Sequence, residues 1–84
     1  MTSPHVEPRR VRVHVALTER VASRVADHLN RTGSSQATLA RAVGVTEASV
    51  SRWASGGSLP STVELVFLAN ALGTTIDELL LTDP

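Results

Sequence analysis

The side chains with the most informative chemistry lie in one short segment, residues 47–55. Val50 and Trp53 are three residues apart, the spacing of an apolar stripe on a helix that packs against a core. At about 100° per residue, the opposite side of that helix carries small, polar and charged side chains: Glu47, Ala48, Ser51, Arg52 and Ser55. Such a face is suited to reading the edges of base pairs in a DNA groove.

Arg52 is the strongest candidate for a base contact, because its planar guanidinium matches the two acceptors of guanine. The alternatives are a phosphate contact or a surface salt bridge with Glu47 or Asp27. Ala48 has the chemistry to touch a thymine methyl group. Glu47 has the chemistry to accept a hydrogen bond from a cytosine amino group. However, an acid in the first turn also suits the helix dipole, and for Glu47 we favour that simpler interpretation.

Residues 35–53 contain the elements that must position this face. A first helix is predicted over 36–43, with an inner stripe of apolar side chains, namely Leu39, Ala40 and Val43. Gly44 follows, where a helix that ends in a left-handed conformation favours glycine. Thr46 is placed to cap the second helix with its hydroxyl. Two short helices around one glycine turn predict a helix-turn-helix, whose second helix lies in the major groove of DNA.

The rest of the chain predicts a compact all-α domain over residues 18–81, with the helix-turn-helix at 36–54. Eighty-four residues leave room for one core. The five expected helices are Thr18–Arg31, Gln36–Val43, Glu47–Ser55, one that opens with the capping box Ser61/Glu64 and ends at Gly73, and one that opens with Thr75/Glu78.

Residues 1–17 form an N-terminal arm before this domain. Residues 1–9 contain two prolines and no periodicity, which favours disorder. Residues 10–16 alternate apolar and polar side chains, a pattern typical of a strand. Because no other segment has a strand pattern, a strand here needs a partner from a second molecule. The alternative is a mobile, extended arm.

Many residues between positions 36 and 80 follow one order and spacing: Gln36, Leu39, Ala40, Gly44, Val45, Val50, Ser51, Trp53, Gly56, Pro60, Leu68, Ala69, Leu72, Gly73 and the run 76–80. In this set the chain resembles the lambda-repressor-like (Cro/CI-type, XRE) helix-turn-helix family. Ala54 departs from the pattern, because similar sequences often have Glu directly after the tryptophan. The resemblance implies that Gln36 binds a DNA phosphate beside the amides of its helix.

Further backbone contacts are expected from hydroxyls and arginines. Thr46 and Ser49 are candidates for hydroxyl contacts to the DNA backbone. Arg10 and Arg12 of the arm are candidates for gripping phosphates or entering a minor groove. Arg41 lies on the outward side of its helix, where solubility is an equally good explanation.

The formal net charge of zero hides a split along the chain. Residues 1–56 hold eight arginines against four acids, a net +4, whereas residues 57–84 hold four acids and no Lys or Arg, a net −4. Such asymmetry fits a half that faces DNA and a half turned away from it. The alternative is that these charges only solvate the surface.

Several function classes find no support in the sequence. There is no cysteine, and His5, His14 and His28 are too scattered for a metal site. No catalytic triad, carboxylate pair or phosphate loop stands out, so we expect neither an enzyme nor a cofactor or small-molecule ligand. With no membrane-length apolar run and no signal peptide, we expect a cytoplasmic, nucleoid-associated protein of a bacterium or an infected host.

Two features point to a homodimer. Val63 and Phe67 lie about 160–200° around their helix from the core residue Leu65, so they face away from the core. In the family, the last helices form the dimer interface. A competing idea is that one face of the arm covers Phe67 of the same chain or of the partner chain. This face consists of Val11, Val13 and Val15. Two recognition helices would reach successive major grooves about 34 Å apart on a palindromic site.

The sequence therefore predicts a sequence-specific regulator of transcription that binds double-stranded DNA as a homodimer, most simply a Cro-like repressor. The alternative is an antitoxin-type autoregulator that also binds a protein partner. A weaker alternative is an architectural or excision accessory factor that bends DNA.

Overall fold

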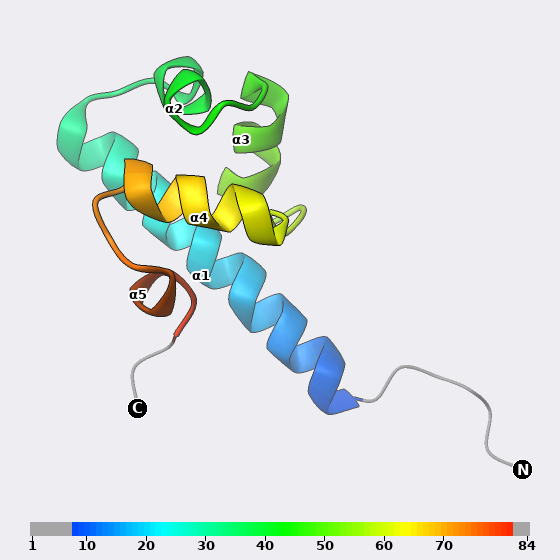
Figure 1. Ribbon diagram of the computed structural model, residues 1–84. Helices are drawn as coiled ribbons and strands as arrows, with labels where there is room; N and C mark the ends of the chain where they lie inside the picture. Colours follow the sequence, from blue (N-terminus) through cyan, green and yellow to red (C-terminus); the bar gives the residue numbers. More distant parts are fainter. Residues whose placement is uncertain (1–7, 82–84) are drawn as a thin grey trace, which may run out of the picture.

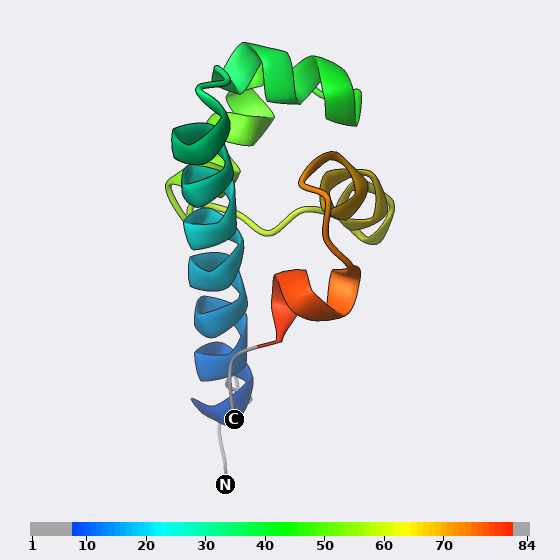
Figure 2. The same ribbon diagram turned by 90° about the vertical axis from the view of Figure 1, so that its left-hand side faces the viewer.

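One long helix, α1 (Pro8–Thr32), organises the molecule, and four shorter helices pack along it towards its C-terminal end (Figure 1). The computed structural model describes residues 8–81 of the chain. The shorter helices are α2 (Gln36–Val43), α3 (Glu47–Ala54), α4 (Thr62–Ala71) and α5 (Ile76–Leu80). Figure 2 shows α1 as a straight column, with α2 across its C-terminal end and α4 and α5 beside it. The described residues contain no strand, so the all-α prediction is confirmed.

All five helices contribute to a single apolar core. Val21 and Val25 of α1 are fully buried, as are Leu68 of α4 and Leu79 of α5. Trp53 of α3 is the core's one aromatic side chain and is 2% exposed. Each large side chain of this kind contributes roughly 1.5–3 kcal/mol when it leaves water. Packing therefore holds together helices that are too short to be stable alone. No described helix is long and apolar enough to cross a membrane.

The N-terminal part of α1 corrects two expectations. The strand considered for residues 10–16 is not formed, and the segment is not an extended arm either, because α1 is helical from Pro8 onwards. Proline is well tolerated in the first turn of a helix, where its missing N–H has no intrahelical partner. Thr18, expected as the N-cap, instead lies inside α1 and is buried, and its hydroxyl donates to the Val15 carbonyl at 2.8 Å. The disorder predicted for residues 1–9 is wrong for Pro8 and Arg9, which belong to α1, and residues 1–7 lie outside the described residues.

The other helix ends lie within two residues of those expected, and the largest difference is at α4, which ends at Ala71 instead of Gly73. Ser61 and Glu64 form the reciprocal capping box at the start of α4. At α5 the Thr75 hydroxyl accepts the Glu78 N–H at 3.1 Å, but the Glu78 carboxylate bonds the Thr75 hydroxyl instead of the Thr75 N–H. The α3 helix ends at Ala54, one residue earlier than expected, and Ser55 is its C-cap.

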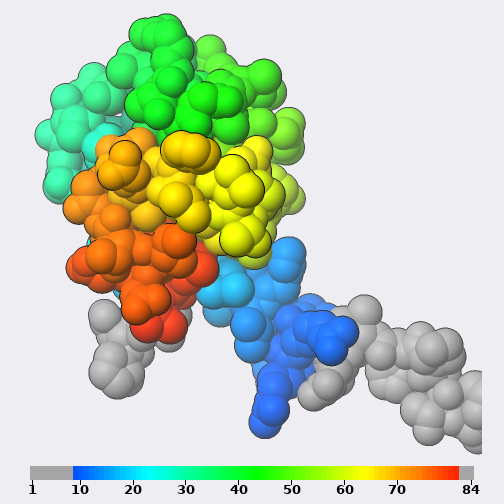
Figure 3. Space-filling view, viewed as in Figure 1, coloured from blue at the N-terminus to red at the C-terminus, as the bar shows by residue number. Residues whose placement is uncertain are grey.

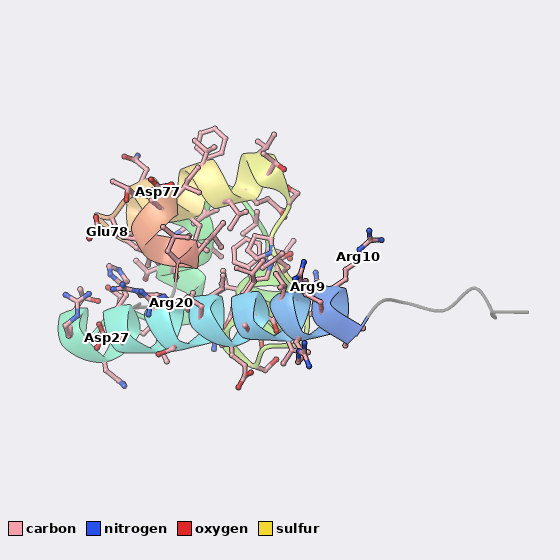
Figure 4. The ribbon with its side chains drawn as sticks, turned by 90° about the horizontal axis from the view of Figure 1, so that it is seen from below. Arg9, Arg10, Arg20, Asp27, Asp77 and Glu78 are labelled. Carbon is pink, nitrogen blue, oxygen red and sulfur yellow. The ribbon has the colours of Figure 1, made fainter. Side chains whose placement is uncertain are left out.

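Two arginines of α1 hold α5 in place. One Nη2 atom from each of Arg20 and Arg24 donates to the main-chain carbonyl of Glu78, at 3.2 and 3.1 Å. Carbonyls in the last turn of a helix have no partner within the helix, so cations are favoured there. Figure 4 shows Arg20 directed from α1 towards Glu78. Part of the basic charge of the chain is therefore used inside the fold.

The N-terminal end of α1 extends past the globule formed by the other helices (Figures 1 and 3). We call residues 9–16 the overhang. Every residue in it is exposed, and its three valines, Val11, Val13 and Val15, are 45–50% exposed. The overhang is thus a helical segment that exposes valines and arginines and has no packing partner among the described residues.

A second exposed apolar surface lies on α4. Its inner side carries buried Leu65 and Leu68, as expected. On the opposite side Val63 is 64% exposed and Phe67 is 52% exposed, as the sequence predicts, and Val66 joins them at 47%. We call these three side chains the outer face of α4. A helix that is apolar on both sides is normally covered on both sides.

We expect Gly44→Ala to lower the free energy of unfolding by about 1–2 kcal/mol, because Gly44 ends α2 with φ 88° and an L-residue is strained there. A Cβ at this position meets no atom within 4 Å, so the loss reflects backbone strain alone. Urea unfolding at one fixed protein concentration measures it. Gly44→Asn, which tolerates this conformation better, should lose less. Equal losses for the two variants would contradict the strain argument.

Candidate nucleic-acid interface

The joint between α2 and α3 is built from local backbone bonds. The N–H groups of Gly44 and Val45 both donate to the Ala40 carbonyl, at 2.8 and 3.0 Å, which closes the end of α2. Thr46 then caps α3 by accepting the Ser49 N–H at 3.2 Å. Gly44 and Thr46 therefore have the roles that the sequence predicts. The glycine turn and the cap together fix the angle at which α3 leaves α2.

Both helices of the pair carry the same polar arrangement at their N-terminal turns. In α3 the Thr46 hydroxyl meets the Ser49 hydroxyl at 3.1 Å, and Arg52 donates to Ser49 at 3.1 Å. The same arrangement recurs in α2, at its cap, third and sixth positions, namely Ser35, Thr38 and Arg41. Because these positions are three residues apart, each series runs along one side of its helix.

The packing of α3 leaves its predicted reading face open. Val50 and Trp53 are buried, at 0% and 2% exposure. All five residues expected on the opposite face are exposed: Glu47, Ala48, Ser51, Arg52 and Ser55. Ser49 is half-buried at the edge of that face. The structure therefore brings the predicted base-reading residues together on one solvent-facing surface.

Arg52 is not neutralised by a carboxylate within the described residues. Its Nη2 atom donates to Ser49 rather than to Glu47, and Asp27 is paired with Arg31 at 2.8 Å. The salt-bridge alternatives for Arg52 are thus absent from the structure. A guanidinium held only by a neutral hydroxyl keeps most of its donors for an anion or a base edge.

The remaining cations are distributed in a way that the charge count along the chain could not show. Arg20 and Arg24 are used to hold α5, and Arg31 pairs with Asp27. Only Arg41 and Arg52 lie on the helix-turn-helix itself. The basic character of this surface therefore depends on two arginines per chain and on the N-terminal ends of α2 and α3.

Arg10 and Arg12 lie in the overhang, at the opposite end of α1 from α2 (Figure 1). Figure 4 shows Arg9 and Arg10 at one end of α1 and Asp27 near the other. The structure thus does not bring these arginines together with the α2–α3 surface. Their contact with DNA stays a prediction. Gln36, in contrast, is the first residue of α2 and is half-buried at its N-terminal end.

A comparison with protein-family models gives one match, to the helix-turn-helix family, over residues 29–79. That match covers more than half of the chain. The chain belongs to the lambda-repressor-like helix-turn-helix family. Neither the comparison with curated proteins nor that with solved structures gave a match.

Membership of this helix-turn-helix family makes the protein a DNA-binding regulator of transcription. The matched segment starts near the C-terminal end of α1 and ends in α5. It includes the α2–α3 pair and the outer face of α4. The overhang lies outside it, so the family match does not account for that segment.

Sequence reasoning missed the polar side of α2. Thr38 is exposed and hydrogen-bonded to Ser35 and to Arg41. The signal was present, because Ser35 and Thr38 repeat the spacing of Thr46 and Ser49 eleven residues later. Arg41 therefore has a second explanation besides solubility, as a cation beside the N-terminal turn of α2.

We expect binding to non-specific duplex DNA to weaken with salt at a slope of roughly −2 log units per log of salt for each bound subunit. This value counts Arg41 and Arg52 at about 0.9 each. If Arg9, Arg10 and Arg12 also neutralise phosphates, the slope per subunit becomes roughly −4.5. Anisotropy titrations over a salt series measure it, with stoichiometry from sedimentation.

The double variant Arg10→Gln, Arg12→Gln is the matched control for that slope. An unchanged slope places the overhang away from DNA. A slope that becomes shallower by about 2 per subunit supports the contact predicted from the sequence.

Proposed function

We propose that the protein is a sequence-specific repressor that binds a palindromic operator as a homodimer, in the manner of short Cro-like regulators. The observation that carries the proposal is the exposed face of α3, with Arg52 turned to solvent and unpaired with any carboxylate among residues 9–81. A helix whose other side is locked into the core presents this face at a fixed angle. That is what reading a DNA groove requires.

Each contact predicted on α2 and α3 has a place in this proposal. Base edges are read from α3, and phosphates are held at the N-terminal turns of both helices. The proposed DNA-contacting residues are Gln36, Thr46, Glu47, Ala48, Ser49, Ser51, Arg52 and Ser55. Arg52 is the base reader, and the hydroxyls with Gln36 set the register on the backbone.

The outer face of α4 supports the homodimer. A single α3 reads only a few base pairs, and a two-fold pair doubles both contacts and specificity. Phe67 and Val63 are large apolar groups that a monomer leaves in water. A dimer on an operator that overlaps a promoter represses by occlusion, on nucleoid DNA in the cytoplasm. No further domain is needed for this action.

Selection from a random duplex pool tests the proposal most directly. We expect enrichment of a palindrome whose half-sites are centred about 10 base pairs apart, or a multiple of that spacing. Without any enriched sequence, the proposed site reading fails. An enriched but asymmetric site would support sequence-specific binding and contradict the two-fold dimer.

The same selection with the variants Arg52→Met and Arg41→Met distinguishes base recognition from phosphate binding. We expect Arg52→Met to lose preference at one position in each half-site, a discrimination of about 1–3 kcal/mol. Arg41→Met should keep the consensus and weaken binding equally for all sequences. If the two variants behave alike, Arg52 is a phosphate contact.

We expect Phe67→Asp to weaken dimerisation at least tenfold, because a charge replaces an apolar ring in the proposed interface. Sedimentation equilibrium measures the change, and circular dichroism checks that the helices persist. Ser23→Asp, an equal change of charge at an exposed position of α1, is the control. An unchanged dimer in Phe67→Asp would remove the outer face of α4 from the interface.

A further inference from the structure

We propose that the overhang of α1 docks on the α4–α5 surface of a second copy of the chain, and that the second copy does the same in return. The inference rests on the homodimer of the proposed function and names how its two surfaces meet. It assigns a role to residues 9–16, which the family match does not cover.

The overhang carries three exposed valines of α1 beyond the globule. At about 100° per residue, Val11 and Val15 lie on one side of His14 and Val13 lies on the other. Val21 and Val25, which are fully buried, lie on the same side of α1 as His14, so the valines of the overhang flank the continuation of the core stripe. Val11 and Val15 form one exposed apolar side of the overhang, and Val13 lies on nearly the opposite side. Its valines stay exposed to water in a single chain, so a covering partner would stabilise the overhang by removing their apolar surface from water.

The acceptor surface is the outer face of α4 with the end of α5. Val63, Val66 and Phe67 are about half exposed or more, and Leu81 after α5 is 62% exposed. These side chains are the large exposed apolar groups of the described residues outside the overhang. One chain thus carries two uncovered apolar surfaces, and two copies related by a two-fold axis cover both of them in each copy.

Charge favours this pairing over a pairing of like surfaces. The overhang has three arginines and no acid. Residues 62–81 hold three acids, Glu64, Asp77 and Glu78, and no Lys or Arg. Two overhangs packed together, or two α4–α5 surfaces packed together, would bring like charges towards each other, whereas overhang on α4–α5 brings opposite charges together. Arg20 and Arg24 already show an arginine side of α1 binding α5 within one chain.

The arrangement of the helices leaves the DNA surface open. The overhang and α5 lie towards one end of the molecule, and α2 and α3 lie at the other (Figures 1 and 2). Figure 3 shows α4 on the visible face, and Figure 2 shows the overhang as the continuation of the α1 column, with α4 beside that column. A two-fold axis that runs from the α5 end to the α2 end keeps both α3 helices at one end of the dimer. Two reading faces on one side suit a single DNA duplex.

A mixed cross-linking experiment tests the pairing. The chain has no cysteine, so each introduced thiol is unique. A size-tagged Val11→Cys chain is mixed with an untagged Val63→Cys chain and treated with a short, flexible bis-maleimide. We expect at least tenfold more tagged–untagged product than Val11–Val11 or Val63–Val63 product. Ser23→Cys, exposed on another side of α1, replaces Val11→Cys as the control and should give little mixed product.

Each other outcome overturns the inference in a defined way. Mainly Val63–Val63 product indicates an α4–α4 interface, and mainly Val11–Val11 product indicates paired overhangs. If a Val11→Cys, Val63→Cys double variant cross-links within one chain, the overhang folds back on its own α4. A monomer without product at micromolar concentration indicates a different occupant of both surfaces.

The outcome is independent of the proposed function. Cross-linking needs no DNA, so the two proposals can fail separately. An enriched palindrome without mixed cross-linked product supports the repressor and contradicts this interface. Mixed product without any enriched sequence supports the interface and contradicts the repressor.

Discussion

The burial of Val50 and Trp53 is the constraint on which the DNA-facing surface depends. These two side chains fix the rotation of α3 about its own axis, because no other side of the helix is apolar enough to take their place in the core. The α3 helix packs on both α1 and α2. Once it is held from two sides, the direction of Arg52 and its neighbours follows from helical geometry alone. The reading face is thus a consequence of core packing rather than of interactions made by its own residues.

The parts of the fold that could be predicted from the sequence are those decided by local chemistry. A glycine at the end of α2 and a hydroxyl before α3 act within a few residues, so their effect is visible in a short window. The capping box of α4 is of the same kind. Helix-period stripes such as Val50 with Trp53 also identify the buried side without knowledge of the partner.

The N-terminal end of α1 could not be predicted because its local pattern favours a different structure. Valines at every second position lie on one side of a strand, whereas on a helix they fall on two nearly opposite sides. What decides between strand and helix is continuity with the helix that follows, which is anchored by the buried residues Val21 and Val25. Helix propagation from an existing turn costs little, whereas a strand without a partner leaves its backbone unsatisfied. The predicted N-cap role of Thr18 is wrong because a threonine can also bond backwards to a carbonyl inside a helix.

The distribution of charge was the least predictable feature, because its partners are distant in sequence and partly main chain. Arg20 and Arg24 bind a carbonyl more than fifty positions away, and no residue type announces a carbonyl acceptor. The +4 of the N-terminal half is therefore not a measure of the DNA-facing charge. Arg41 and Arg52 alone carry that charge on the helix-turn-helix. Affinity for DNA then has to come from exact placement of few contacts, and doubling those contacts in a dimer matters more than it would for a strongly basic domain.

A continuous helix gives the proposed dimer a rigid link between its two surfaces. The α1 helix is packed against α3 at one part of its length and forms the overhang at its N-terminal end, with no loop between the two. A loop-mounted interface would let the distance between two reading faces vary, whereas a helix of 25 residues transmits its position with little bending. If the overhang holds the partner, the spacing between the two α3 helices is set by the length of α1. The spacing of the operator half-sites is then a property of the same helix that builds the core.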